Sequence, residues 1–139
     1  MSRDEFAARR QVDQAQDELE LTTRHMAETA ARAAAGIFAR DVVIIDLKEL
    51  VSYTDYFVVA SVETERQTRR IVEEVLEKMN KEGYRPRSRR FDEGSVWVSL
   101  DFIDVVVHVF TDEARDYYRL ESLWRSAPQE HWEEEEATR

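Results

Sequence analysis

The chain has 139 residues, 42% of them hydrophobic and 36% charged, a composition typical of one folded domain with a very polar surface. Its formal net charge of −10 repels phosphate backbones, which argues against DNA binding and for little direct contact with RNA. The absence of cysteine excludes disulfides and thiolate metal sites, and no apolar run is long enough to cross a membrane.

The first 22 residues form a charged N-terminal extension. Residues 3–21 alternate charged side chains, glutamine and alanine without a sustained apolar face, so either a solvated helix or a mobile segment is compatible with them. Acidic residues are interleaved with Arg3, Arg9 and Arg10, which is unlike an organelle presequence and favours the cytoplasm. Apolar residues recur at helical spacing from Thr22 onwards, which predicts an amphipathic helix capped by Thr22 or Thr23.

Two buried strands and a helix are expected next. The β-branched run at residues 42–45 and the apolar run at residues 56–60 are both typical of strands. Thr64 and Gln67 have the spacing of a capping box, so a helix begins there with one apolar stripe. Gly83 supplies the left-handed conformation that commonly ends a helix.

The second half of the chain predicts further strands and a last helix. Residues 84–90 carry four arginines and are typical of a solvated strand edge, and two more strands follow at residues 96–100 and 105–110, joined by a tight turn. Thr111 opens a helical segment reaching Trp124, in which Tyr117, Tyr118 and Trp124 are expected in the core. Residues 127–139 are an acidic tail whose run at residues 133–136 is typical of disorder.

This order of elements predicts a single mixed α/β domain over residues 23–126. Long connections between the early strands and a short turn between the late strands imply a mixed sheet covered by helices.

Trp97 is the strongest candidate for a binding residue, because tryptophan dominates interface hot spots. On a strand, Trp97, Ser99 and Asp101 share one face, whereas Val96, Val98 and Leu100 share the other. The apolar set should face the helices, which turns Trp97 outward. His108 lies within an apolar strand and is expected to be a hydrogen-bonded structural histidine, since no other histidine has metal-ligand spacing to it.

Two blocks of sequence resemble the ribosomal silencing factor family, also known as the Iojap family. The first is Asp-Tyr-Phe-Val-Val-Ala-Ser at residues 55–61, and the second runs from Trp97 through Val-His-Val-Phe at residues 107–110 to Tyr-Arg-Leu-Glu-Ser-Leu-Trp at residues 118–124. The resemblance spans about residues 23–125. The chain departs from the family at Phe38, where a lysine is usual, and at Ile103, where a glycine is usual.

The resemblance implies a protein that binds the fourteenth protein of the large ribosomal subunit and sterically blocks the small subunit, repressing translation without enzyme activity, cofactor or metal. An acidic chain suits a basic ribosomal protein. The expected docking surface comprises Trp97, Ser99, Asp101, Asp55 and Tyr56. A large-subunit assembly factor or a dimerising scaffold is the alternative, and a homodimer is compatible with either.

The family's fold is related to that of nucleotidyltransferases, which hold metal with paired carboxylates. Asp101 and Asp104 are the nearest match, but their spacing of three sends the side chains to opposite faces of an extended strand. The glycine-serine element of those enzymes is absent at residues 61–63. A nucleotidyltransferase-like topology without the catalytic motif is therefore expected.

Overall fold

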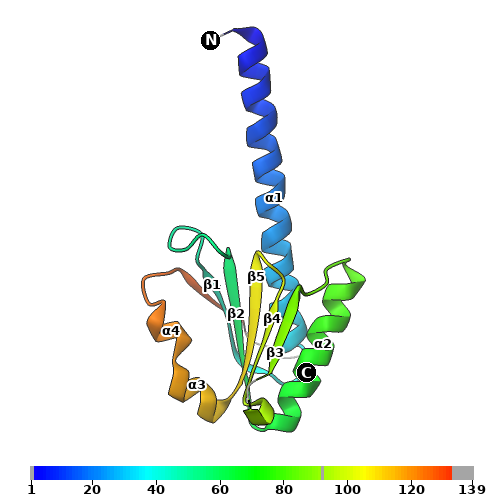
Figure 1. The fold of residues 1–139 in the computed structure, drawn as a ribbon, viewed down its shortest axis with the longest axis vertical. Coiled ribbons are helices and arrows are strands. Elements are labelled where there is room, and N and C mark those ends of the chain that lie inside the picture. The colour runs from blue at the N-terminus through cyan, green and yellow to red at the C-terminus, as the bar shows by residue number, and fades with distance from the viewer. Residues whose placement is uncertain (1, 92, 133–139) are drawn as a thin grey trace, which may run out of the picture.

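A computed structural model of the chain describes residues 2–91 and 93–132 and shows helices on both faces of one sheet (Figure 1). The helices are α1 (Arg3–Ala35), α2 (Glu65–Lys81), α3 (Asp112–Tyr118) and α4 (Leu120–Leu123). The strands are β1 (Arg40–Asp46), β2 (Tyr56–Val62), β3 (Ser88–Phe91), β4 (Trp97–Asp101), β5 (Val105–Thr111) and β6 (Gln129–Trp132), and a short turn of 3-10 helix, η1 (Glu93–Ser95), precedes β4.

Within the described residues the sheet has six strands in the order β3-β4-β5-β2-β1-β6. The central pair, β2 and β5, is parallel, and α2, β3 and β4 supply the long connection that a parallel pair requires. Every other neighbouring pair is antiparallel. The mixed α/β sheet predicted from the sequence is confirmed.

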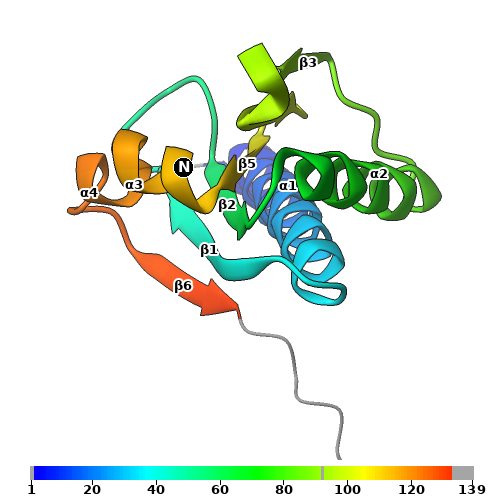
Figure 2. The ribbon, with the colours of Figure 1, turned by 90° about the horizontal axis from the view of Figure 1, so that it is seen from below.

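The sheet separates two apolar clusters. α1 and α2 cover one face, where alanines of α1 let the helix approach β-branched residues of β1, β2 and β5 closely (Figure 2). On the other face, α3, α4 and the chain leading to β6 cover Val43, Ile45, Phe57 and Val59. The two short helices lie over β1, β2 and β5, and the same face is less covered toward β3 and β4 (Figure 2).

α1 is one continuous helix of 33 residues, which resolves the alternatives left open for the first 21 residues. It begins at Ser2, whose hydroxyl accepts a hydrogen bond from the Glu5 amide at 3.2 Å. The expected cap at Thr22 or Thr23 is wrong. Both threonines lie inside the helix and donate their hydroxyl hydrogens to carbonyl groups of the preceding turn, which lets them stay helical.

The capping box of α2 is confirmed. Thr64 Oγ1 accepts from the Gln67 amide at 3.3 Å, and Gln67 Oε1 accepts from the Thr64 amide at 3.1 Å. After the helix, Gly83 has a φ of 87°, as its predicted role requires.

The C-terminal part differs from expectation in two places. The last helical segment is not continuous, because Arg119 adopts a φ of 49° and separates α3 from α4. Residues 129–132, expected in an acidic tail, form β6 and pair with β1. Trp132 packs against the α1 cluster and Glu130 forms an ion pair with Arg24, so the strand is held by contacts that its local composition does not reveal. The acidic run at residues 133–136 lies outside the described residues.

None of the helices in the described part of the chain combines the length and the apolar character that crossing a bilayer requires.

Candidate protein-binding surface

Strand β4 places its side chains alternately on the two faces of the sheet. Val98 and Leu100 are buried beneath α1 and α2, whereas Trp97 and Ser99 lie on the opposite face and are half-buried. This alternation confirms the predicted separation for residues 97–101. Val96 does not follow it, because Val96 precedes the strand and packs in the same cluster as Trp97.

Trp97 is held by its neighbours rather than standing free on the surface. Its ring stacks on Phe110, with 4.9 Å between ring centroids, and lies 4.6 Å from the ring of Tyr118. Its indole N–H donates a hydrogen bond to His108 Nδ1 at 3.0 Å. Trp97 therefore has a fixed orientation before any partner binds, and only part of its surface remains accessible.

An open cavity of about 450 Å³ lies over this residue. It is lined by residues of β3, β4, β5 and α3, namely Arg90, Phe91, Trp97, Ser99, His108 and Tyr118. Tyr118 is 40% exposed and Phe91 is 53% exposed, so the rim presents aromatic surface to solvent. A concave apolar surface with a few polar groups is what a side chain of a partner protein needs for a well-packed anchor.

His108 supplies a neutral floor to this cavity. Burial lowers the pKa of His108 from its ordinary value of 6.5 to about 4, so the ring is uncharged at neutral pH. Because Nδ1 accepts from Trp97, the ring proton resides on Nε2. Nε2 finds no hydrogen-bond partner among the residues that the structure describes. The hydrogen bond to Trp97 fits the predicted structural role of this histidine.

The other predicted docking residues do not gather around Trp97. Tyr56 is buried on the opposite face, 4% exposed, where its hydroxyl accepts from Lys48 Nζ at 2.9 Å. The prediction that Tyr56 lies on the docking surface is wrong, because the alternation of side chains along β2 places Tyr56 under α1. Asp55 is half-buried at the start of β2, where burial first and then Asp104 raise the pKa of its carboxyl group.

Asp101 lies at the far end of β4 from Trp97 and is already engaged. Its Oδ2 pairs with Arg87 at 2.7 Å and its Oδ1 accepts from the Ile103 amide at 2.7 Å. These contacts make Asp101 a turn residue of the β4–β5 hairpin. In the described part of the chain, no group of three His, Asp or Glu residues is placed to hold a metal ion.

Sequence reasoning missed Arg90 and Tyr118 as residues of this surface. Tyr117 and Tyr118 were expected in the core, yet Tyr117 is 81% exposed, because α3 ends one residue after it and covers the sheet with Ala114 instead. Two adjacent tyrosines point in different directions on a helix, a signal that at least one is outside the core.

A second, more polar cavity of about 630 Å³ lies between α3, α4 and the strands β1, β2 and β6. Its central cation, Arg115, donates to Ser61 Oγ at 2.7 Å and to the carbonyl oxygen of Asp41, and forms an ion pair with Glu121. These contacts satisfy the guanidinium within the chain. The cavity therefore joins α4 to the sheet.

Fold and surface together define a small mixed α/β protein with an open aromatic cavity on one face of its sheet. A family model described as "Ribosomal silencing factor during starvation" matches residues 9–139. The chain belongs to this family.

Proteins similar to this chain share its domain but differ in length. The Bacillus subtilis ribosomal silencing factor is 32% identical over 78% of this chain and 92% of its own length. A mouse protein named "Mitochondrial assembly of ribosomal large subunit protein 1" is 34% identical over 62% of this chain and 39% of its own. A crystal structure from Chromobacterium violaceum has a TM-score of 0.70 at 30% identity, and covers 73% of this chain and 85% of that one.

Proposed function

We propose that this protein binds the large ribosomal subunit through its fourteenth protein and represses translation by blocking the small subunit sterically, without covalent chemistry. Membership of a family of ribosomal silencing factors supports a partner on the ribosome. The observation that carries the docking surface is the aromatic cavity around Trp97, which is preorganised and open. The cytoplasm is the proposed compartment.

The chemistry of the cavity suits a protein partner. Trp97 and Tyr118 offer aromatic area whose orientation is already fixed, so little side-chain entropy is lost on binding. The neutral His108 lets the cavity floor be desolvated without burying a charge. The net charge of −10 favours encounter with a basic ribosomal protein.

Sedimentation with purified subunits tests the proposed occlusion. The protein should sediment with free large subunits and be absent from joined ribosomes, because the proposed site is covered once the subunits meet. Adding the protein to separated subunits before mixing should reduce the joined fraction. Equal recovery of the protein from both pools would contradict the mechanism.

Tyr118→Ala tests the position of the docking surface. Tyr118 lines the cavity and does not form the indole hydrogen bond that fixes Trp97, so its loss should weaken large-subunit binding roughly 10- to 100-fold with little change in folding. Tyr53→Ala is the matched control, since Tyr53 is 62% exposed and lies outside the cavity. An equal effect of both substitutions would place the contact elsewhere.

Assembly of the large subunit is a second candidate function, favoured by the name of the mouse relative. The two roles separate in cells that lack the protein. Accumulation of incomplete large subunits in growing cells would favour assembly, whereas normal subunits that join excessively during starvation would favour silencing.

A further inference from the structure

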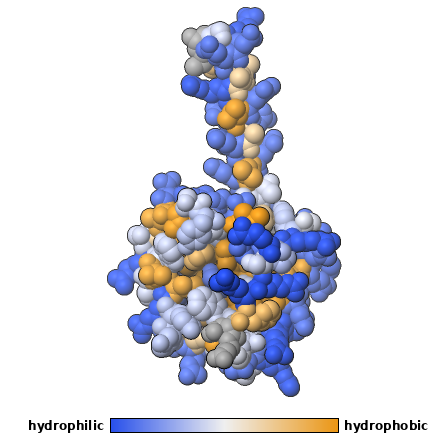
Figure 3. Space-filling view, in the orientation of Figure 1, coloured by the Kyte–Doolittle hydropathy of each residue, from blue (hydrophilic) through white to orange (hydrophobic). Residues whose placement is uncertain are grey.

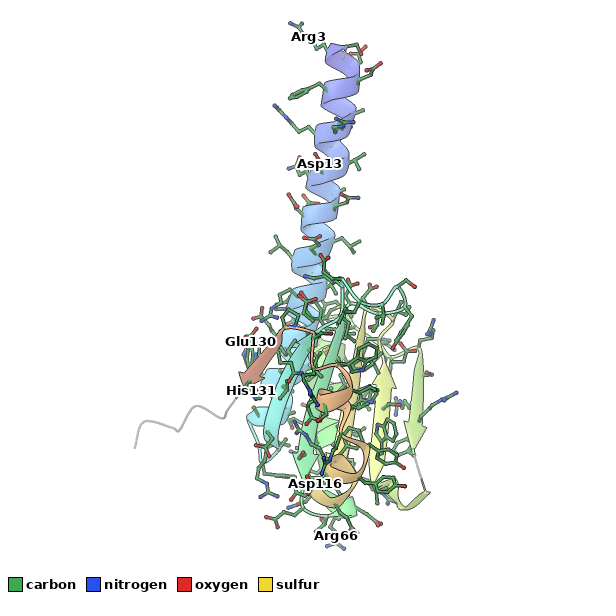
Figure 4. The ribbon with its side chains drawn as sticks, turned by 90° about the vertical axis from the view of Figure 1, so that its left-hand side faces the viewer. Arg3, Asp13, Arg66, Asp116, Glu130 and His131 are labelled. Carbon is green, nitrogen blue, oxygen red and sulfur yellow. The ribbon has the colours of Figure 1, made fainter. Side chains whose placement is uncertain are left out.

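The first two thirds of α1 stand clear of the folded domain. Figure 4 shows this part of the helix with Arg3 and Asp13 well above the sheet, and every residue from 2 to 22 is exposed. A helix of this length without tertiary contacts is marginally stable in water. We call residues 3–22 the α1 extension.

The α1 extension carries a narrow apolar stripe. Ala8, Val12, Ala15 and Leu19 recur at spacings of four, three and four, which places them on one side of the helix. Val12 is 55% exposed and Leu19 is 60% exposed. Figure 3 shows apolar side chains along the projecting helix on the face toward the viewer.

This stripe continues the face by which the lower part of α1 packs on the domain. Thr23, Met26 and Ala30 follow Leu19 at the same spacing, and all three are buried. The same face of α1 is therefore covered by the domain from Thr23 onwards and exposed to solvent before Thr23.

The charges of the α1 extension are divided along its length. Residues 3–10, toward the tip, carry a formal charge of +1, because Asp4 and Glu5 offset two of three arginines. Residues 11–20, toward the base, carry −4, from Asp13, Asp17, Glu18 and Glu20. Two copies side by side in the same direction would bring their acidic halves together and their domains into collision. Two copies in opposite directions bring each basic tip to the acidic base of the other.

We propose that two copies of this chain associate through antiparallel pairing of their α1 extensions. In the register that aligns the stripes, Val12 packs against Ala15 of the other copy and Ala8 against Leu19. Arg9 then lies beside Glu20 of the other copy, twice by symmetry. This interface is remote from the aromatic cavity, so the pair would leave both proposed docking surfaces open.

Sedimentation equilibrium of the full chain tests the association. We expect a monomer–dimer equilibrium that Leu19→Lys weakens by about tenfold or more, because it buries a charge in the stripe. Leu21→Lys is the matched control: Leu21 is 70% exposed, and nine residues at ~100° each place it on the opposite side from Val12. A chain that stays monomeric at high concentration, or equal effects of both substitutions, would overturn the proposal.

Direction is tested by charge reversal and by distance. Arg9→Glu should weaken the dimer, and adding Glu20→Arg should restore it.

The chain has no cysteine, so Arg3→Cys gives one spin-labelling site per copy. Antiparallel pairing separates the two labels by roughly 30 Å, at ~1.5 Å per residue, whereas parallel pairing holds them roughly 10 Å apart. A separation near ~10 Å would overturn the antiparallel arrangement. If the protein is monomeric and Leu19→Lys lowers its binding to large subunits, the stripe contacts the ribosome and the proposed dimer is wrong.

Discussion

Trp97 and His108 form a pair in which each residue determines the state of the other. The indole N–H can only donate, so His108 must present an unprotonated Nδ1 to it. Burial keeps the ring neutral, and the neutral ring keeps Trp97 in place. The sequence predicts on which face of the sheet Trp97 lies. It does not predict the contacts that hold the ring, since neither Phe110 nor Tyr118 is a neighbour of Trp97 in sequence.

The depressed pKa of His108 predicts a loss of stability in mild acid. The pKa is about 4 in the folded state against 6.5 unfolded, so between these values the unfolded chain binds more protons. The free energy of unfolding should therefore fall by up to about 3 kcal/mol as the pH drops from 6.5 to 4. His108→Asn keeps an acceptor for Trp97 and does not titrate. Urea unfolding across this range should give a shallower decline for the variant, and equal declines would contradict the assignment.

Ile103 is strained in the turn between β4 and β5. Its φ of 76° lies in the left-handed region, which a β-branched residue rarely adopts. Ile103 is 51% exposed, so little burial is lost on truncation. Ile103→Gly should raise the free energy of unfolding by about 1 kcal/mol in urea titrations. Ile103→Ala retains a Cβ and should gain less, and a stability equal to that of the glycine variant would contradict the strain.

At the scale of elements, the sequence predicts most strands and α2 because their signals are local. β-branched runs define β1 and β5, and the capping box defines the start of α2. The start of α1 depends on a single local cap, whereas the existence of β6 depends on non-local contacts. Ser2 caps a helix whose first turns touch nothing else, and β6 is a strand only because β1 offers it an edge. The aromatic cavity is missed for the same reason, since α3 and β3 meet there from distant parts of the chain.

β6 should contribute to folding although its sequence is acidic. A chain that ends at Pro128 loses the pairing with β1, the packing of Trp132 and the ion pair between Glu130 and Arg24. We expect its free energy of unfolding to drop by at least about 2 kcal/mol. A chain that ends at Trp132 keeps all three contacts and should unfold like the full protein. If both truncated chains lose equal stability in thermal or urea unfolding, β6 is not the stabilising element.

For the whole molecule, the net charge of −10 predicts that association with large subunits depends on salt. Exposed charges are screened beyond ~8 Å at physiological ionic strength, so the association rate should fall as salt is added while the dissociation rate changes less. Stopped-flow or surface-based kinetics at several salt concentrations measure both rates. An association rate independent of salt would show that long-range attraction does not guide the encounter.

The parallel pairing of β2 with β5 also governs how the chain acquires its structure. Tyr56 pairs with Val105, and α2, β3 and β4 lie between them in the sequence. Contacts between such distant residues require a long loop to close first, which slows folding. β4 in turn reaches the rest of the sheet only through β5. During synthesis, the β1–β2 pair must therefore wait for β5 before it can join β3 and β4, and the sheet is complete only when β6 has followed.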